Sequence, residues 1–99
     1  MIARSIENRS IDLLVITNKN NVCVKDDFSI ETLKTKKPIL FISARVHPGE
    51  VPASHVMNGI LDYILLINPT ILDKYVFLCV PMINPDGVYR GHWRVDSIG

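Results

Sequence analysis

The sequence predicts an α/β fold with a mixed, mainly parallel sheet and a crossover helix. Three observations predict it. Apolar runs occupy residues 39–44 and 76–82, and an amphipathic segment lies between them at 51–67. A strand, a helix and a second strand in this order form a crossover unit with parallel strands in one sheet. Polar segments follow both strands, so they are expected at one edge of the sheet, where α/β folds place their ligands.

The amino-terminal third predicts one strand and a polar connection. The unbroken apolar run at 13–16 places a strand at 11–17, and such a run is typical of a strand buried on both faces. The asparagine-rich residues 18–21 predict a turn, because asparagine tolerates left-handed backbone angles. A short return strand is expected at 22–24. Residues 28–37 are polar and are expected to form a connection with one helical turn at most.

Residues 39–44 form the clearest predicted strand. Pro38 fits its first position, where no ladder donor is required. The four large apolar residues at 39–42 predict a central strand that is covered on both faces. We expect the helix that follows to pack on this strand.

A helix is predicted at 51–67. Pro52 suits its first turn, since the missing N–H is not needed there. Apolar side chains recur at the spacing of one broad helical face, at residues 56, 57, 60, 61, 64 and 65. Gly59 would allow this helix to approach the sheet closely. The pair Asn68-Pro69 ends the helix, because the residue before a proline avoids the α region.

The last third of the sequence predicts one more strand between turns. Residues 70–74 suit a short further helical turn, and 75–82 are almost wholly apolar and predict the third strand. Residues 83–87 give a strong turn signal. Residues 88–99 are polar and punctuated by glycine, without periodicity.

Composition and charge exclude several classes of function. With 99 residues the chain forms one domain at most. A net charge of +1 gives no basic footprint for nucleic acid, and the basic residues at 34–37 suit a solvated loop. No apolar run approaches the roughly 18 residues of a membrane helix, and no signal peptide is recognisable. Cys23 and Cys79 predict no disulfide framework, and Cys79 is expected in the core. We expect a soluble, cytoplasmic protein.

His47 and Glu50 are candidate metal ligands. They lie three residues apart, where the strand at 39–44 gives way to the helix. An imidazole nitrogen and a carboxylate oxygen suit zinc, and a catalytic zinc ion needs three protein ligands and one open position. The third ligand must therefore come from elsewhere. The alternatives are a surface or core histidine and a glutamate that simply starts the helix near its positive end.

Two arginines and two further histidines follow or flank this pair. Arg90 and Arg94 lie in the polar segment after the third strand, which topology places beside His47 and Glu50. An arginine beside a zinc site can stabilise the oxyanion of a tetrahedral intermediate, and the alternative is a solvated or stacking arginine. His55 and His92 are expected at the surface.

Three ordered motifs resemble those of the zinc metallocarboxypeptidases. They are His-Pro-Gly-Glu at 47–50, Asn-Pro-Asp-Gly-Val at 84–88 and Arg-Gly-His-Trp-Arg at 90–94. The sequence is most similar to the cytosolic carboxypeptidase branch, which trims glutamate from tubulin and other proteins. The resemblance implies zinc as cofactor, with His47 and Glu50 as its first two ligands. It implies that Arg94 is catalytic and binds the substrate by polarising the scissile carbonyl, and that residues 84–87 shape the wall of the site.

The resemblance also implies parts that these 99 residues lack. The family's third zinc ligand, its general-base glutamate and its Asn-Arg carboxylate clamp have no counterpart here. Residues 1–99 are therefore expected to be a truncated, amino-terminal part of a carboxypeptidase catalytic domain that is inactive alone. The expected partners are polypeptide carboxy-terminal tails or glutamate side chains, tubulin among them, with no nucleic acid or membrane. The alternatives are a non-catalytic binding module that keeps half of the fold and an unrelated α/β domain.

Overall fold

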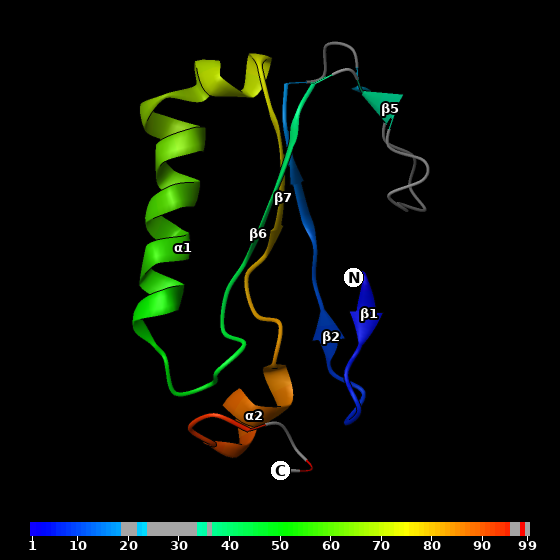
Figure 1. Cartoon of the computed structure of the whole chain (residues 1–99), viewed down its shortest axis with the longest axis vertical. Coiled ribbons are helices and arrows are strands. Elements are labelled where there is room, and N and C mark those ends of the chain that lie inside the picture. The colour runs from blue at the N-terminus through cyan, green and yellow to red at the C-terminus, as the bar shows by residue number, and fades with distance from the viewer. Residues whose placement is uncertain (19–21, 24–33, 36, 96–97, 99) are drawn as a thin grey trace.

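The computed structural model describes residues 1–18, 22–23, 34–35, 37–95 and 98 (Figure 1). Its elements follow in chain order: β1 (Ala3–Arg4), β2 (Ser10–Ile11), β3 (Leu14–Ile16), β4 (Val22–Cys23), β5 (Lys34–Thr35), β6 (Ile39–Ser43), α1 (Pro52–Asp62), the π-helix η2 (Tyr63–Ile67), the 3₁₀-helix η3 (Pro69–Asp73), β7 (Val76–Val80) and α2 (Pro85–Arg90).

The main sheet has three strands, with β7 in the middle. β6 runs parallel to β7, with Ile42 opposite Cys79. β3 runs antiparallel to β7, with Leu14 opposite the same cysteine. The sheet is therefore mixed, and the parallel pair joined through α1 is the crossover unit that the sequence predicts. The other described strands form two short antiparallel pairs, β1 with β2 and β4 with β5.

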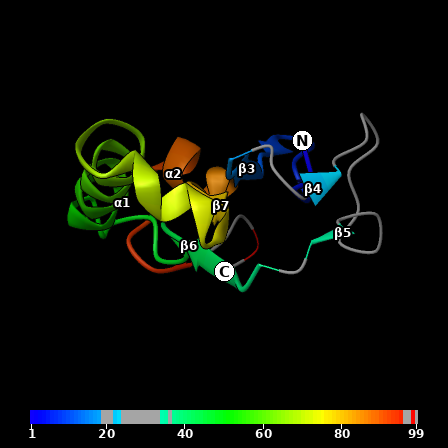
Figure 2. The same cartoon turned by 90° about the horizontal axis from the view of Figure 1, so that it is seen from above.

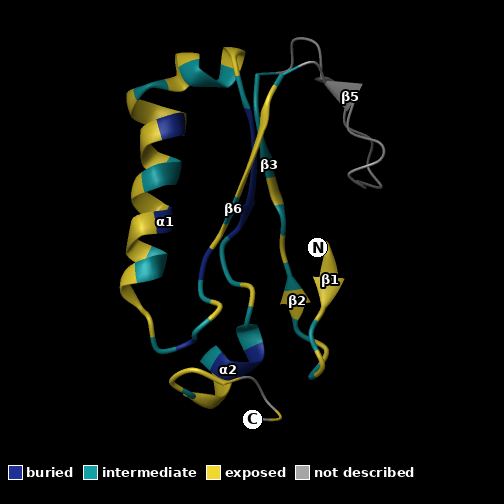
Figure 3. Ribbon diagram, viewed as in Figure 1, coloured by how far each residue is buried: buried dark blue, intermediate teal, exposed yellow. Residues whose placement is uncertain are grey.

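The core lies on both faces of β7, because successive side chains of a strand point to opposite faces. Phe77 and Cys79 join the cluster beneath α1, which lies along one side of the sheet in Figures 1 and 2. Val76 and Leu78 form the second cluster with residues in and beside β3. All five residues of β7 are buried, as the dark blue strand in Figure 3 shows. Cys79 is the core residue that the sequence predicts, and burial raises the pKa of its thiol.

Within the described residues, the strand at 39–44 is neither central nor covered on both faces. β6 lies at the edge of the described sheet, and Ile39, Leu40 and Phe41 are exposed. An apolar run shows that a strand is suited to burial, but it does not identify the neighbour that buries it. The residues of β3 are likewise exposed or only half-buried. Burial of both strands on two faces in the intact domain stays a prediction.

The long helix confirms the prediction for residues 51–67. α1 begins at Pro52 and passes directly into η2. Met57 and Ile64 are buried in the cluster with Phe77, so the helix packs on the sheet as expected. Gly59 does not serve a close approach to the sheet, because it is exposed and a Cβ there would meet nothing within 4 Å. η3 confirms the short further turn.

The turn signal at 83–87 marks the start of a helix. The Asn84 side chain caps α2, because its Oδ1 accepts a hydrogen bond from the Gly87 N–H at 3.0 Å. Gly91 ends the helix in the left-handed conformation, with φ of 72°. Asparagine favours turns and helix caps alike, so the local sequence did not separate the two outcomes.

The return strand predicted at 22–24 forms as β4, which pairs with β5. Residues 19–21 of the turn expected at 18–21 and most of the connection expected at 28–37 lie outside the described residues. Within the described residues, no helix has the length and hydrophobicity that crossing a membrane requires.

Candidate metal centre

The loop between β6 and α1 is held by Arg45. Its Nε and Nη2 donate to the Pro48 carbonyl at 3.1 and 2.6 Å, and its Nη1 donates to Ser54 Oγ at 2.9 Å. Arg45 has a φ of 61°, in the left-handed region, which turns the chain as it leaves the strand. The role of Arg45 could not be predicted from the sequence, since no local pattern signals a side chain that folds back onto its own loop.

This loop brings the two candidate metal ligands together. His47 Nδ1 lies 3.2 Å from Glu50 Oε1, and the two side chains are 35% and 50% exposed. Two donor atoms that each bind a tetrahedral zinc ion at about 2.0–2.2 Å lie roughly 3.3–3.6 Å apart. The observed separation is close to this value, so the pair fits one zinc ion with little movement. Their exposure leaves both donors accessible.

Arg94 lies against the same two residues. Its Nη2 is 3.3 Å from His47 Nε2, and its Nη1 is 3.6 Å from Glu50 Oε1. A guanidinium has no acceptor, so a hydrogen bond between Arg94 and a neutral imidazole requires Nε2 to accept. The imidazole proton is then on Nδ1 and faces the Glu50 carboxylate. The structure thus brings together all three residues that the sequence singled out for metal binding and catalysis.

The segment that carries Arg94 is docked onto the loop by its backbone. The Gly49 N–H donates to the Trp93 carbonyl at 2.7 Å. A Cβ at Gly49 would lie 2.2 Å from the Trp93 ring, so only glycine allows this close approach. Asn84 Nδ2 donates to the Val46 carbonyl at 3.1 Å. These contacts join residues far apart in the sequence and confirm that the two strand ends share one edge.

The other candidates lie apart from this point. Arg90 pairs with Glu7, with its Nε at 2.8 Å from Oε1. His55 is exposed on α1, and His92 is half-buried in the loop after α2. The described part of the chain contains no group of three or more histidine, cysteine, aspartate or glutamate residues placed to hold a metal ion.

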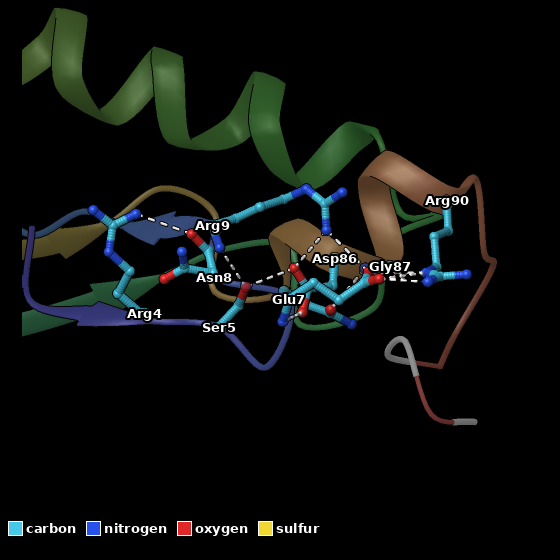
Figure 4. Close-up of polar contacts among 9 residues, drawn as sticks. Arg4, Ser5, Glu7, Asn8, Arg9, Asp86, Gly87 and Arg90 are labelled. Atoms are coloured by element: carbon cyan, nitrogen blue, oxygen red, sulfur yellow. Dashed lines mark hydrogen bonds and ion pairs between the residues drawn. The ribbon is translucent and has the colours of Figure 1, made fainter.

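A second polar cluster joins α2 to the turn between β1 and β2 (Figure 4). Asp86, 3% exposed, accepts hydrogen bonds from Ser5 Oγ at 2.6 Å, Arg9 Nη1 at 2.9 Å and the Glu7 N–H at 3.0 Å. Glu7 Oε1 accepts from Arg9 Nη1 at 2.9 Å, and the Glu7 carboxylate forms an ion pair with Arg90. We call these five residues the clamp: Ser5, Glu7, Arg9, Asp86 and Arg90.

Both carboxylates of the clamp have pKa values below their ordinary range. Burial alone would raise the pKa of Asp86, but the hydrogen bonds from Ser5, Arg9 and the Glu7 N–H together outweigh it. The hydrogen bond from Arg90 has the largest effect on the pKa of Glu7 and lowers it; burial opposes this, and the hydrogen bond from Arg9 adds to the lowering. Arg9 and Arg90 are stabilised as cations in return. The clamp is therefore an ionic network at neutral pH.

The lowered pKa values predict the pH dependence of the clamp. Its stabilising effect is complete above the ordinary values of about 3.9 for aspartate and 4.3 for glutamate, and it is lost as the pH falls through the lower folded values. Carbon-13 titration of the Glu7 and Asp86 carboxyl groups should show both midpoints below these ordinary values. The Glu7→Gln variant should lose the glutamate part of the acid dependence of stability. A midpoint above the ordinary value for either group would contradict the network.

A family model described as zinc carboxypeptidase matches residues 1–97. The chain belongs to the zinc carboxypeptidase family. This confirms the resemblance seen in the three motifs. The family implies zinc and peptide substrates, while the individual roles of His47, Glu50 and Arg94 stay predictions.

Relatives of this zinc carboxypeptidase chain include cytosolic carboxypeptidases. It is 40% identical to human cytosolic carboxypeptidase-like protein 5 in an alignment of 114 residues. This alignment covers 100% of this chain and 13% of the relative. It is 37% identical to mouse cytosolic carboxypeptidase 6 in an alignment of 101 residues, and this alignment covers 99% of this chain and 17% of the relative. The chain therefore spans less than a fifth of the length of these curated relatives.

Solved structures support the same fold. A putative carboxypeptidase A from Shewanella denitrificans matches 99% of this chain and 23% of its own chain, with a TM-score of 0.77 and 30% identity. A putative carboxypeptidase from Burkholderia mallei matches 99% of this chain and 24% of its own, with a TM-score of 0.78 and 24% identity. The mixed sheet with its crossover helix thus matches about a quarter of each of these carboxypeptidase structures.

Proposed function

We propose that this chain supplies part of the zinc centre of a carboxypeptidase that removes carboxy-terminal residues from proteins. The observation that carries the proposal is the meeting of His47, Glu50 and Arg94 at one point, from two segments that follow neighbouring parallel strands. Two metal donors beside a guanidinium suit hydrolysis of a peptide bond, because that reaction develops negative charge on a carbonyl oxygen.

His47, Glu50 and Arg94 would have different roles in the reaction. His47 Nδ1 and Glu50 Oε1 would hold the ion, with the imidazole proton then on Nε2 and Arg94 released from that nitrogen. Bound zinc supplies a Lewis acid and a water molecule of lowered pKa. Arg94 would donate N–H groups to the carbonyl oxygen of the scissile bond and would stabilise the charge that develops there. Arg45 and the Asn84 side chain would keep the two segments in place, through the hydrogen bonds described above.

We propose carboxy-terminal glutamate as the residue released, with protein tails such as that of tubulin as substrates and the cytosol as the compartment. Support comes from the resemblance of the three motifs to the cytosolic carboxypeptidase branch and from the names of the relatives. A catalytic zinc site also needs a third protein ligand and a general base. We propose that these groups come from outside the present 99 residues, so the chain alone should not turn over glutamate-ended peptides.

Zinc titration of the chain tests the metal site. Calorimetry should show one weak site, well short of the about 10–16 kcal/mol of complete structural zinc sites, because two donors supply only part of the coordination energy. His47→Ala should abolish the binding heat. His55→Ala is the matched control and should leave it unchanged, since His55 is exposed on α1.

Two outcomes would count against this reading. Affinity in the nanomolar range would contradict an incomplete site. Binding that survives His47→Ala would place the ion elsewhere and would favour a non-catalytic binding module.

A further inference from the structure

The clamp attaches α2 to the β1–β2 turn at both ends of the helix (Figure 4). In the first helical turn, Asp86 accepts from Ser5, Arg9 and the Glu7 N–H. In the last turn, Arg90 pairs with the Glu7 carboxylate. Attachment at two points fixes the direction of a six-residue helix, whereas one point would leave it free to pivot.

The β1–β2 turn is itself well ordered. The Asn8 N–H donates to the Ser5 carbonyl, the Ser5 N–H donates to the Arg9 carbonyl, and each distance is 2.9 Å. The Arg9 guanidinium also lies over the Tyr89 ring, 3.8 Å from its centroid. The turn therefore gives α2 a fixed support. The buried carboxylate of Asp86 is tolerated because each of its described hydrogen bonds compensates its charge.

α2 in turn touches the metal loop and leads directly to Arg94. A Cβ at Gly87 would lie 2.6 Å from Pro48 Cγ, so helix and loop are in close contact. Gly91 then turns the chain back, and Arg94 follows four residues after Arg90. A change in the direction of α2 would therefore be passed on to Arg94.

We propose that Glu7 is a positioning residue for Arg94. Through its ion pair with Arg90, Glu7 fixes the carboxy-terminal end of α2 and thereby the place of the Arg94 guanidinium beside His47. The inference deepens the proposed function, because it gives the reaction a positioning residue from the β1–β2 turn. Its test uses neither zinc nor substrate, so it can fail or succeed independently of the proposed activity.

The Nε2 nitrogen of His47 reports the position of Arg94. Arg94 Nη2 lies 3.3 Å from Nε2, while Nδ1 faces the Glu50 carboxylate. If Arg94 moves away, Nε2 loses this contact, and its nitrogen-15 shift changes even if the contact with Glu50 remains. A loss of stability elsewhere in the fold would not produce this change.

The experiment compares nitrogen-15 spectra of the His47 ring at neutral pH in the 99-residue chain and its variants. Arg94→Ala removes the donor and defines the shift expected for full displacement. Glu7→Gln and Arg90→Gln break the proposed link from either side, and both should move the His47 signals most of the way toward the Arg94→Ala values. Asp12→Asn is the matched control, since Asp12 lies on the same hairpin and pairs with the amino terminus.

Each result decides the proposal. It is supported if both link variants shift His47, Asp12→Asn does not, and the backbone amides of β6 and β7 keep their positions. It is overturned if His47 is unchanged in either link variant, because the link needs both partners. Collapse of the β6 and β7 amide signals in both link variants would also overturn it, since Glu7 would then hold the whole fold.

Discussion

Replacing Phe77 with alanine is expected to lower the free energy of unfolding by about 3–5 kcal/mol. Phe77 is 4% exposed in the middle strand, and it packs with Met57, Ile64 and, at a tilt, Tyr75. Removing its ring leaves a cavity that β7, paired on both edges, cannot move to close. Because domains are stable by only about 5–15 kcal/mol, this loss would remove between about a fifth and all of the stability.

Phe41→Ala is the matched control for this prediction. It removes the same side chain from the neighbouring strand, but Phe41 is 59% exposed. Its loss should cost less than about 1 kcal/mol. Urea unfolding measures both values. Equal losses in the two variants would show that β7 is not the centre of the core.

Replacing Arg94 with alanine is expected to lower kcat by about 10²–10³-fold in an active enzyme, as for other lost donors to a developing oxyanion. The test uses a chimera in which residues 1–99 replace the matching segment of a cytosolic carboxypeptidase, assayed on glutamate-ended peptides. We propose that the remainder of the relative supplies the third ligand and the base, so the unmodified chimera should be active. Zinc content should be the same in both proteins.

Arg4→Ala controls for the loss of an arginine. Arg4 is exposed in β1, and its Nη1 donates to the Asn8 carbonyl, away from His47. Turnover in this variant should equal that of the unmodified chimera. Full turnover by the Arg94→Ala chimera would show that Arg94 does not take part in the reaction.

Much of the fold could be predicted from the sequence, because its signals are local. Periodicity and Pro52 gave the long helix within one residue at its start, and the order of elements gave the parallel pair of β6 and β7. The arrangement of strands across the sheet could not be predicted. The apolar runs of β6 and β7 are alike in composition, yet among the strands that the structure describes β7 alone pairs on both edges. Which strand lies in the middle depends on contacts between distant segments.

The candidate site could likewise be predicted from the sequence only in part. Topology alone predicted that the segments bearing His47 and Arg94 would meet, since both follow parallel strands, and the structure brings them to 3.3 Å. The clamp could not be predicted. Ser5 and Glu7 meet Asp86 across about eighty residues, and no motif or periodicity relates them. Asp86 lies inside a recognised motif, but the sequence does not show which partners neutralise its charge.

The position of β7 between β6 and β3 also sets an order for folding. Both neighbours align with Cys79, Ile42 from one side and Leu14 from the other, and Leu14 is 65 residues away along the chain whereas Ile42 is 37 residues away. Closing a loop costs entropy that grows with its length, by about 0.6 kcal/mol for each doubling. Part of the shorter loop is also taken up by α1, which forms from local contacts. We therefore expect β6, α1 and β7 to assemble first, and β3 to join a unit that is already built.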